Sequence, residues 1–94
     1  MEHFHSENTD KLFEAILTLK SVDECYKLFE DLCTIKEIQD MAQRFEVARM
    51  LSDNKVYNLI ASETGASTAT ISRVNKALVY GKDGYKLAIS RLKK

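Results

Sequence analysis

Apolar side chains recur along most of the chain at intervals of three and four residues, which is the spacing of amphipathic helices. Helix-breaking residues are rare, because the sequence contains three glycines and no proline. The pattern therefore predicts an all-α fold of about six helices in a single domain over residues 1–94. After a frayed start at residues 1–8, helices are expected at about 9–20, 21–33 and 34–52, as two helices within 54–80, and at 83–93.

Capping signals mark where several of these helices begin and end. Asn8 or Thr9 can cap the first helix. The runs Ser-Val-Asp-Glu at 21–24 and Thr-Ile-Lys-Glu at 34–37 have the pattern of a capping box, in which the hydroxyl and the carboxylate each accept a backbone N–H. Asp53 and Asn54 are expected to end the third helix, so the second capping box and this break define one long helix between them.

The most informative segment is residues 57–74, which read Tyr-Asn-Leu-Ile-Ala-Ser-Glu-Thr-Gly-Ala-Ser-Thr-Ala-Thr-Ile-Ser-Arg-Val. Gly65 lies where the chain must reverse, since a residue without Cβ adopts positive φ at little cost. Ser67 is a favourable N-cap for a second helix, and the small Ala61 allows that helix to cross closely over the first. Gly81 is expected to end the second helix. This spacing is typical of a DNA-binding helix-turn-helix.

The second helix of this motif has two different faces. Ile71, Val74 and Leu78 fall within about 60° of one another at 100° per residue, and we expect them to be buried. The opposite face is small, polar and basic. The residues expected to contact DNA are Asn58 on the first helix and Ser67, Thr68, Ala69, Thr70, Ser72, Arg73 and Lys76 on the second.

Charge is distributed unevenly although the formal net charge is zero. Residues 1–42 carry four basic and ten acidic side chains, and residues 43–66 carry three of each. Residues 67–94 carry seven basic side chains against one acidic. A basic segment that begins with the proposed recognition helix is suited to neutralising phosphates. The alternative is a solvated basic tail beside an acidic one that keeps the chain soluble.

Several classes of function are excluded by what the sequence lacks. No apolar run approaches the roughly 20 residues of a membrane span, and the first residues do not resemble a signal peptide, so we expect a cytoplasmic protein with no membrane partner. There is no glycine-rich phosphate loop and no nucleophile elbow. The two histidines, His3 and His5, lie in the expected frayed start. We therefore predict no catalytic site, no cofactor and no metal site.

The two cysteines are too far apart for a disulfide within one helix. Cys25 and Cys33 are eight residues apart on the second expected helix. We expect both to be buried, reduced thiols in the core of a cytosolic protein.

The first expected helix indicates an oligomer. Its apolar side chains extend around more of the helix than one neighbour would cover, and they are Leu12, Phe13, Ile16, Leu17 and Leu19. A second copy of the chain is the simplest additional partner, so residues 9–52 are predicted to form a two-fold homodimer. A monomer with a tightly folded N-terminal half is the alternative.

Two motifs resemble the Trp-repressor superfamily, and specifically its YerC/YecD branch. They are Gln-Arg-Phe-Glu-Val-Ala-Arg-Met-Leu at 43–51 and Gly-Ala-Ser-Thr-Ala-Thr-Ile-Ser-Arg-Val-Asn-Lys-Ala-Leu at 65–78. The resemblance implies a bacterial-type repressor, built as an intertwined all-helical homodimer whose two helix-turn-helix units face successive major grooves. By position it places Thr68, Ala69, Ser72 and Arg73 at operator bases, and Asn58 and Ala61 beside the DNA backbone.

The resemblance weakens at the corepressor slot. Two arginines and a glycine help to form the tryptophan site in that family, and the corresponding residues here are Gln43, Arg73 and Val74. Gln43 offers no guanidinium to a carboxylate, and Val74 occupies space that a flat indole would need. Arg44 is adjacent to Gln43, but a shift of one residue turns a side chain by about 100° around a helix. These four residues can line a ligand pocket, but tryptophan is disfavoured, which leaves another small effector or none.

Two hypotheses follow. The first is a sequence-specific, double-stranded DNA-binding transcriptional regulator that acts as a homodimer and does not respond to tryptophan. The alternative is a helical interaction module that uses its basic face for RNA or for an acidic protein partner.

Overall fold

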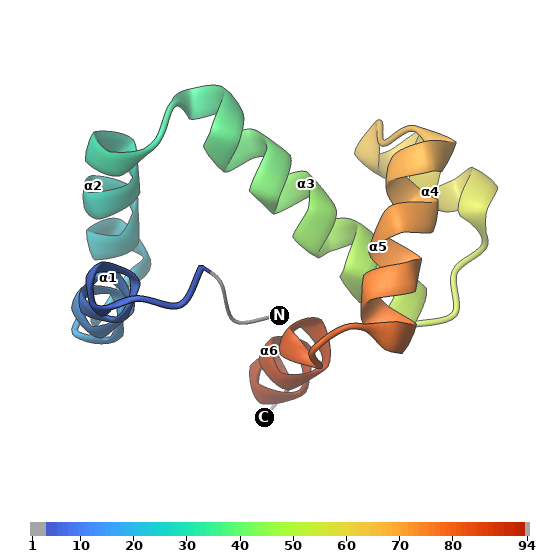
Figure 1. Ribbon diagram of the computed structural model, residues 1–94. Coiled ribbons are helices and arrows are strands. Elements are labelled where there is room, and N and C mark those ends of the chain that lie inside the picture. The colour runs from blue at the N-terminus through green and yellow to red at the C-terminus, as the bar shows by residue number, and fades with distance from the viewer. Residues whose placement is uncertain (1–3, 94) are drawn as a thin grey trace. The chain divides into compact units, whose positions relative to one another are not determined.

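The protein is seen in a computed structural model that describes residues 4–93, and within that range it contains six α-helices and no strand (Figure 1). The helices are α1 (Glu7–Leu17), α2 (Val22–Leu32), α3 (Ile35–Ser52), α4 (Tyr57–Thr64), α5 (Thr68–Tyr80) and α6 (Gly84–Leu92). The predicted all-α fold is confirmed. The chain divides into two compact units, the first ending at Ile38 and the second beginning at Gln39, so the boundary falls within α3.

In the first unit, α1 begins earlier and ends earlier than the sequence pattern predicts. Its N-cap is Ser6, whose Oγ accepts the N–H of Thr9 at 3.1 Å, and not Asn8 or Thr9. Residues 7 and 8 are therefore helical rather than frayed, while residues 1–3 lie outside the described part of the chain. The helix ends at Leu17 because Thr18 turns back, its hydroxyl donating to the carbonyl of Ala15 at 2.6 Å.

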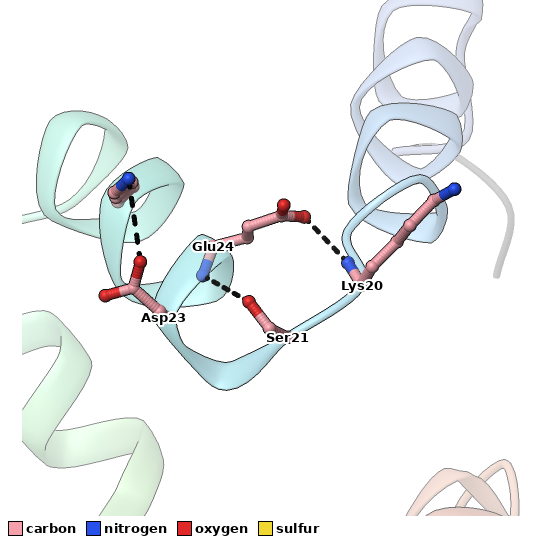
Figure 2. Close-up of polar contacts among 5 residues, drawn as sticks. Lys20, Ser21, Asp23 and Glu24 are labelled. Atoms are coloured by element: carbon pink, nitrogen blue, oxygen red, sulfur yellow. Dashed lines mark hydrogen bonds and ion pairs between the residues drawn. The ribbon is translucent and has the colours of Figure 1, made fainter.

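Capping boxes start α2 and α3, as predicted. Figure 2 shows the first, in which the N–H of Glu24 donates to Ser21 Oγ at 3.1 Å. The Glu24 carboxylate reaches back to the N–H of Lys20 at 2.8 Å, one residue before the cap. At the start of α3, Thr34 and Glu37 make the fully reciprocal pair, at 3.1 and 2.8 Å. Each box satisfies backbone donors that the helix itself cannot pair.

The first unit has no buried side chain between residues 4 and 38. Leu17 is 82% exposed and Phe13 is 52% exposed, although both are apolar. Cys25 is exposed and Cys33 is half-buried, and both are free thiols. The prediction that the cysteines are core residues is therefore wrong, because two short helices in a single chain do not enclose the volume that a core requires.

The second unit contains the hydrophobic core. Val47 on α3, Ile60 on α4 and Ile71 on α5 are each 0% exposed, and the three helices lie together in Figure 1. The other buried members of the cluster are Ala48, Met50, Ala66, Val74 and Ile89. All four helical segments of this unit contribute to one core, so the orientation of α5 is fixed by packing on three neighbours.

The ends of α3 and α5 are set by backbone conformation. Asn54, two residues after the end of α3, adopts a left-handed conformation with φ of 63°, as expected of a residue that breaks the helix. Gly81 ends α5, with its N–H donating to the carbonyl of Ala77 at 2.8 Å. A Cβ added to Gly81 would overlap the backbone carbonyl of Ala77, whereas a Cβ added to Gly84 would meet nothing within 4 Å.

These two glycines give a matched test of how α5 ends. We expect Gly81→Ala to destabilise the fold by about 1–3 kcal/mol, because backbone atoms must move to admit the methyl group. Gly84→Ala should be neutral or stabilise by up to about 1 kcal/mol, since it restricts the unfolded chain without a clash. Urea unfolding followed by circular dichroism measures both. Equal stability of the two variants would show that Gly81 is not needed at this position.

Candidate nucleic-acid interface

The turn between α4 and α5 has the geometry that the sequence predicts. Gly65 is left-handed, with φ of 74°, and its N–H donates to the carbonyl of Ala61 at 2.9 Å. Ala66 follows and is only 5% exposed. Ser67 then caps α5, because its Oγ accepts the N–H of Thr70 at 3.1 Å. Three successive residues thus reverse the chain, anchor it in the core and start the next helix.

Two side chains make further contacts that secure this turn, and sequence reasoning missed both. Thr64 donates its hydroxyl to the carbonyl of Ile60 at 2.7 Å and accepts the N–H of Ala66 at 3.1 Å. From α3, Gln43 Nε2 donates to the carbonyl of Thr64 at 3.1 Å. A threonine directly before a helix-ending glycine is the sequence signal for the contacts of Thr64. The Gln43 contact joins residues 21 positions apart and has no local signal.

The two faces of α5 are those of the predicted helical wheel. Ile71, Val74 and Leu78 are 0%, 3% and 9% exposed, respectively. The opposite face is at the surface, where Thr68, Ala69, Ser72, Arg73 and Lys76 are all exposed. Asn58 on α4 and the cap Ser67 are exposed as well, whereas Thr70 is half-buried and its Oγ1 lies 3.1 Å from Ser67 Oγ. The expected DNA-facing residues are therefore accessible, with Thr70 partly engaged in the cap.

The positive charges on this face are available for a ligand. Lys86 pairs with Asp83 at 3.8 Å and Lys93 pairs with Asp53 at 3.5 Å. Among residues 4–93, no carboxylate forms an ion pair with Arg73 or Lys76. A surface charge that forms no ion pair within the protein has no such contact to give up when it binds a phosphate or a base edge.

A cavity of 200 Å³ lies between α3 and α5. It brings together the four residues expected to line a ligand pocket, and its full lining is Asp40, Gln43, Arg44, Thr70, Arg73 and Val74. Val74 is 3% exposed, so its apolar side chain is buried at this cavity. The amide of Gln43 is directed at Thr64, while the side chains of Arg44 and Arg73 line the same cavity.

His3 lies outside the described residues, and the part of the chain from 4 to 93 contains no cluster of three metal-ligating side chains. Within that same range, no helix combines the length and the apolar character needed to cross a membrane.

Together the fold and this site define an all-α protein with a helix-turn-helix. The chain belongs to the Trp repressor protein family, whose model matches residues 7–93. It is 53% identical over 93 residues to the uncharacterised protein YerC of Bacillus subtilis (strain 168), covering 99% of this chain and 89% of YerC. The resemblance to the Trp-repressor superfamily and its YerC branch is therefore confirmed.

Solved structures of relatives show the same fold. A TrpR-like protein from Eubacterium eligens ATCC 27750 superimposes with a TM-score of 0.95 at 53% identity, covering 99% of this chain and 96% of that one. A candidate Trp repressor from Staphylococcus aureus gives a TM-score of 0.94 at 47% identity, covering 98% of this chain and 92% of that one. The similarity extends over nearly the whole chain, so both units are part of the shared fold.

Proposed function

We propose that this protein is a sequence-specific, double-stranded DNA-binding transcriptional regulator that acts as a homodimer and does not respond to tryptophan. The observation that carries the proposal is the exposed face of α5, which is small, polar and basic, on a helix whose other face is locked in the core. Membership of the Trp repressor family supports it.

The exposed face has the chemistry and the dimensions needed to read a major groove. An α-helix with its side chains is about 10–12 Å in diameter, which fits the roughly 12 Å width of the major groove. Arg73 can donate two hydrogen bonds to guanine, and the hydroxyls of Thr68 and Ser72 can pair with several base edges. Ala69 permits close approach and can contact a thymine methyl group. Lys76, farther along the helix, is suited to a phosphate.

The first helix of the motif is suited to the DNA backbone. The N-cap position of α4 is Val56, which makes no side-chain cap hydrogen bond. The N–H groups in the first turn of α4 are therefore left for solvent or for an anion, and a phosphate oxygen is a favourable acceptor there. Asn58 is exposed in that same turn and can add a side-chain donor. Such contacts fix the register of the protein on the duplex without reading its sequence.

A homodimer would supply the core that the first unit lacks. No side chain between residues 4 and 38 is buried in the single chain, and covering a leucine or phenylalanine side chain stabilises by about 1.5–3 kcal/mol. The monomer alternative requires a tightly folded N-terminal half, which the absence of buried residues in this range disfavours. Two recognition helices also read twice as many base pairs as one, which a specific regulator needs.

The corepressor slot supports a function without tryptophan. The side chain at the first arginine position is Gln43, whose amide is already bonded to Thr64, and the glycine position carries the buried side chain of Val74. Gln43 supplies no bidentate partner for a carboxylate at its position, although Arg44 and Arg73 line the same cavity, and Val74 leaves no flat slot for an indole ring. The interaction-module alternative rests on the basic charge of residues 67–94 alone, and it predicts steep salt dependence with little sequence preference.

Substitutions on the two faces of α5 should abolish function in different ways. Ile71→Asp places a carboxylate in the core, where it has no partner, so we expect loss of helicity together with loss of DNA binding. Arg73→Ala should keep the fold, because the residue is exposed, and should weaken binding to the preferred duplex by about 1–3 kcal/mol. Circular dichroism and binding isotherms on preferred and scrambled duplexes measure both effects.

The salt dependence of Arg73→Ala separates two kinds of contact. A residue that reads a base loses affinity mainly on the preferred duplex, whereas a phosphate contact weakens binding to every duplex and lowers the salt slope by about one. Unchanged binding by a folded Arg73→Ala variant would refute the placement of α5 in the groove and favour the interaction-module alternative.

The homodimer has its own test in light scattering at micromolar concentration. We expect twice the mass of the 10.7 kDa chain. Leu17→Glu is the sharper probe, because Leu17 is 82% exposed in the single chain and its substitution should not affect a monomer. In a dimer that covers it, the same change should raise the dissociation constant at least about tenfold, or about 1.4 kcal/mol.

Asn8→Glu is the matched control for this experiment, since it adds the same charge at a polar position of α1. It should leave the dissociation constant unchanged. A wild-type chain of monomeric mass would rule out the homodimer, and equal dissociation constants of the two variants would show that Leu17 lies outside its interface.

A further inference from the structure

Gln43 ties the turn of the helix-turn-helix to α3. Its Nε2 donates to the carbonyl of Thr64 at 3.1 Å, in a partly buried contact between residues 21 positions apart. A carbonyl can only accept, so the amide must present its nitrogen here. The same nitrogen lies 3.9 Å from where a Cβ on Gly65 would be, which places it directly beside the residue at which the chain reverses.

The acceptor is a group that α4 cannot satisfy by itself. Thr64 is the last residue of α4, and the last four carbonyls of a helix have no partner within it. The hydroxyl of Thr64 is also occupied, since it donates to Ile60 and accepts from Ala66. Gln43 therefore completes a connected set of hydrogen bonds that runs from α3 through the end of α4 to the residue before the α5 cap.

The position of Gln43 also connects the turn to the recognition helix. Gln43 lines the 200 Å³ cavity together with Thr70 and Arg73 of α5. Thr70 belongs to the cap of α5, and Arg73 lies on its exposed face. A movement of Gln43 would thus change the positions of both the α4–α5 turn and the first turns of α5.

We propose that Gln43 is a positioning residue, which holds the turn of the helix-turn-helix against α3 so that α5 is set for DNA without a bound effector. This inference rests on the proposed function. The Gln43 amide thereby fixes the position of the recognition helix α5. DNA should therefore bind without a ligand in the 200 Å³ cavity.

The test compares Gln43→Met with Gln39→Met. Methionine has nearly the length of glutamine and no hydrogen-bond donor, so the first variant removes the contact while keeping the packing. Gln39 is an exposed glutamine on the same helix, about one turn earlier, and its substitution controls for a change of glutamine to methionine on α3. Neither variant changes the net charge.

For Gln43→Met we expect binding to the preferred duplex to weaken roughly threefold to tenfold, the effect of one net hydrogen bond. Helix content and dimer mass should be unchanged. The salt slope of DNA binding should also be unchanged, because no phosphate contact is removed. The amide protons of Gly65 and Ala66 should exchange faster with solvent than in the wild type, as measured by NMR, since they report the opening of the turn. Gln39→Met should match the wild type in every measurement.

Wild-type affinity and unchanged exchange at Gly65 and Ala66 in Gln43→Met would overturn the inference while leaving the proposed function intact. A rise in wild-type DNA affinity on addition of millimolar tryptophan would also overturn it, because α5 would then depend on an effector. If the wild type shows no preference among duplexes, the proposed function fails and the claim about DNA fails with it. Amide exchange then still decides whether Gln43 holds the turn.

Discussion

The packing of Val47, Ile60 and Ile71 is the interaction on which the rest of the second unit depends. These three side chains come from three helices, and each is fully removed from solvent. Their contact fixes how α5 lies against α3 and α4, and thereby determines which side of α5 faces outward. The small residues around them matter for the same reason, since Ala48 and Ala66 allow the backbones to approach closely. The direction in which the exposed face of α5 points is therefore determined by this core.

The first unit, in contrast, has no packed core among its described residues in the single chain. Its helices are well started, by Ser6 and by two capping boxes, yet none of its described side chains is buried. Caps decide where a helix begins, but they contribute too little to hold short helices together without an apolar partner. The proposed homodimer resolves this contrast, because a second copy would provide the missing partner and would also fix the distance between two recognition helices.

The sequence was most predictive where the determining signals are local. Gly65, Ser67 and Gly81 mark the turn and the ends of α5, and the spacing of Ile71, Val74 and Leu78 identifies its buried face. The start of α1 was missed because Ser6, Asn8 and Thr9 are all capping residues, and the choice depends on which hydroxyl meets which N–H. The cysteines were misplaced because burial depends on neighbours that the single chain does not provide. The bond from Gln43 to Thr64 joins distant positions, so no local pattern could have indicated it.

The central claim is that two copies of this chain present α5 to successive major grooves of one duplex. Selection of bound sequences from a library of random DNA duplexes tests it most directly, because the operator sequence emerges from the selection itself. The account predicts enrichment of an inverted repeat whose half-site centres lie about 10 base pairs apart or a multiple of that distance, reflecting the two-fold symmetry of a dimer. No enrichment over the starting library, or enrichment of a single motif without internal symmetry, would contradict it.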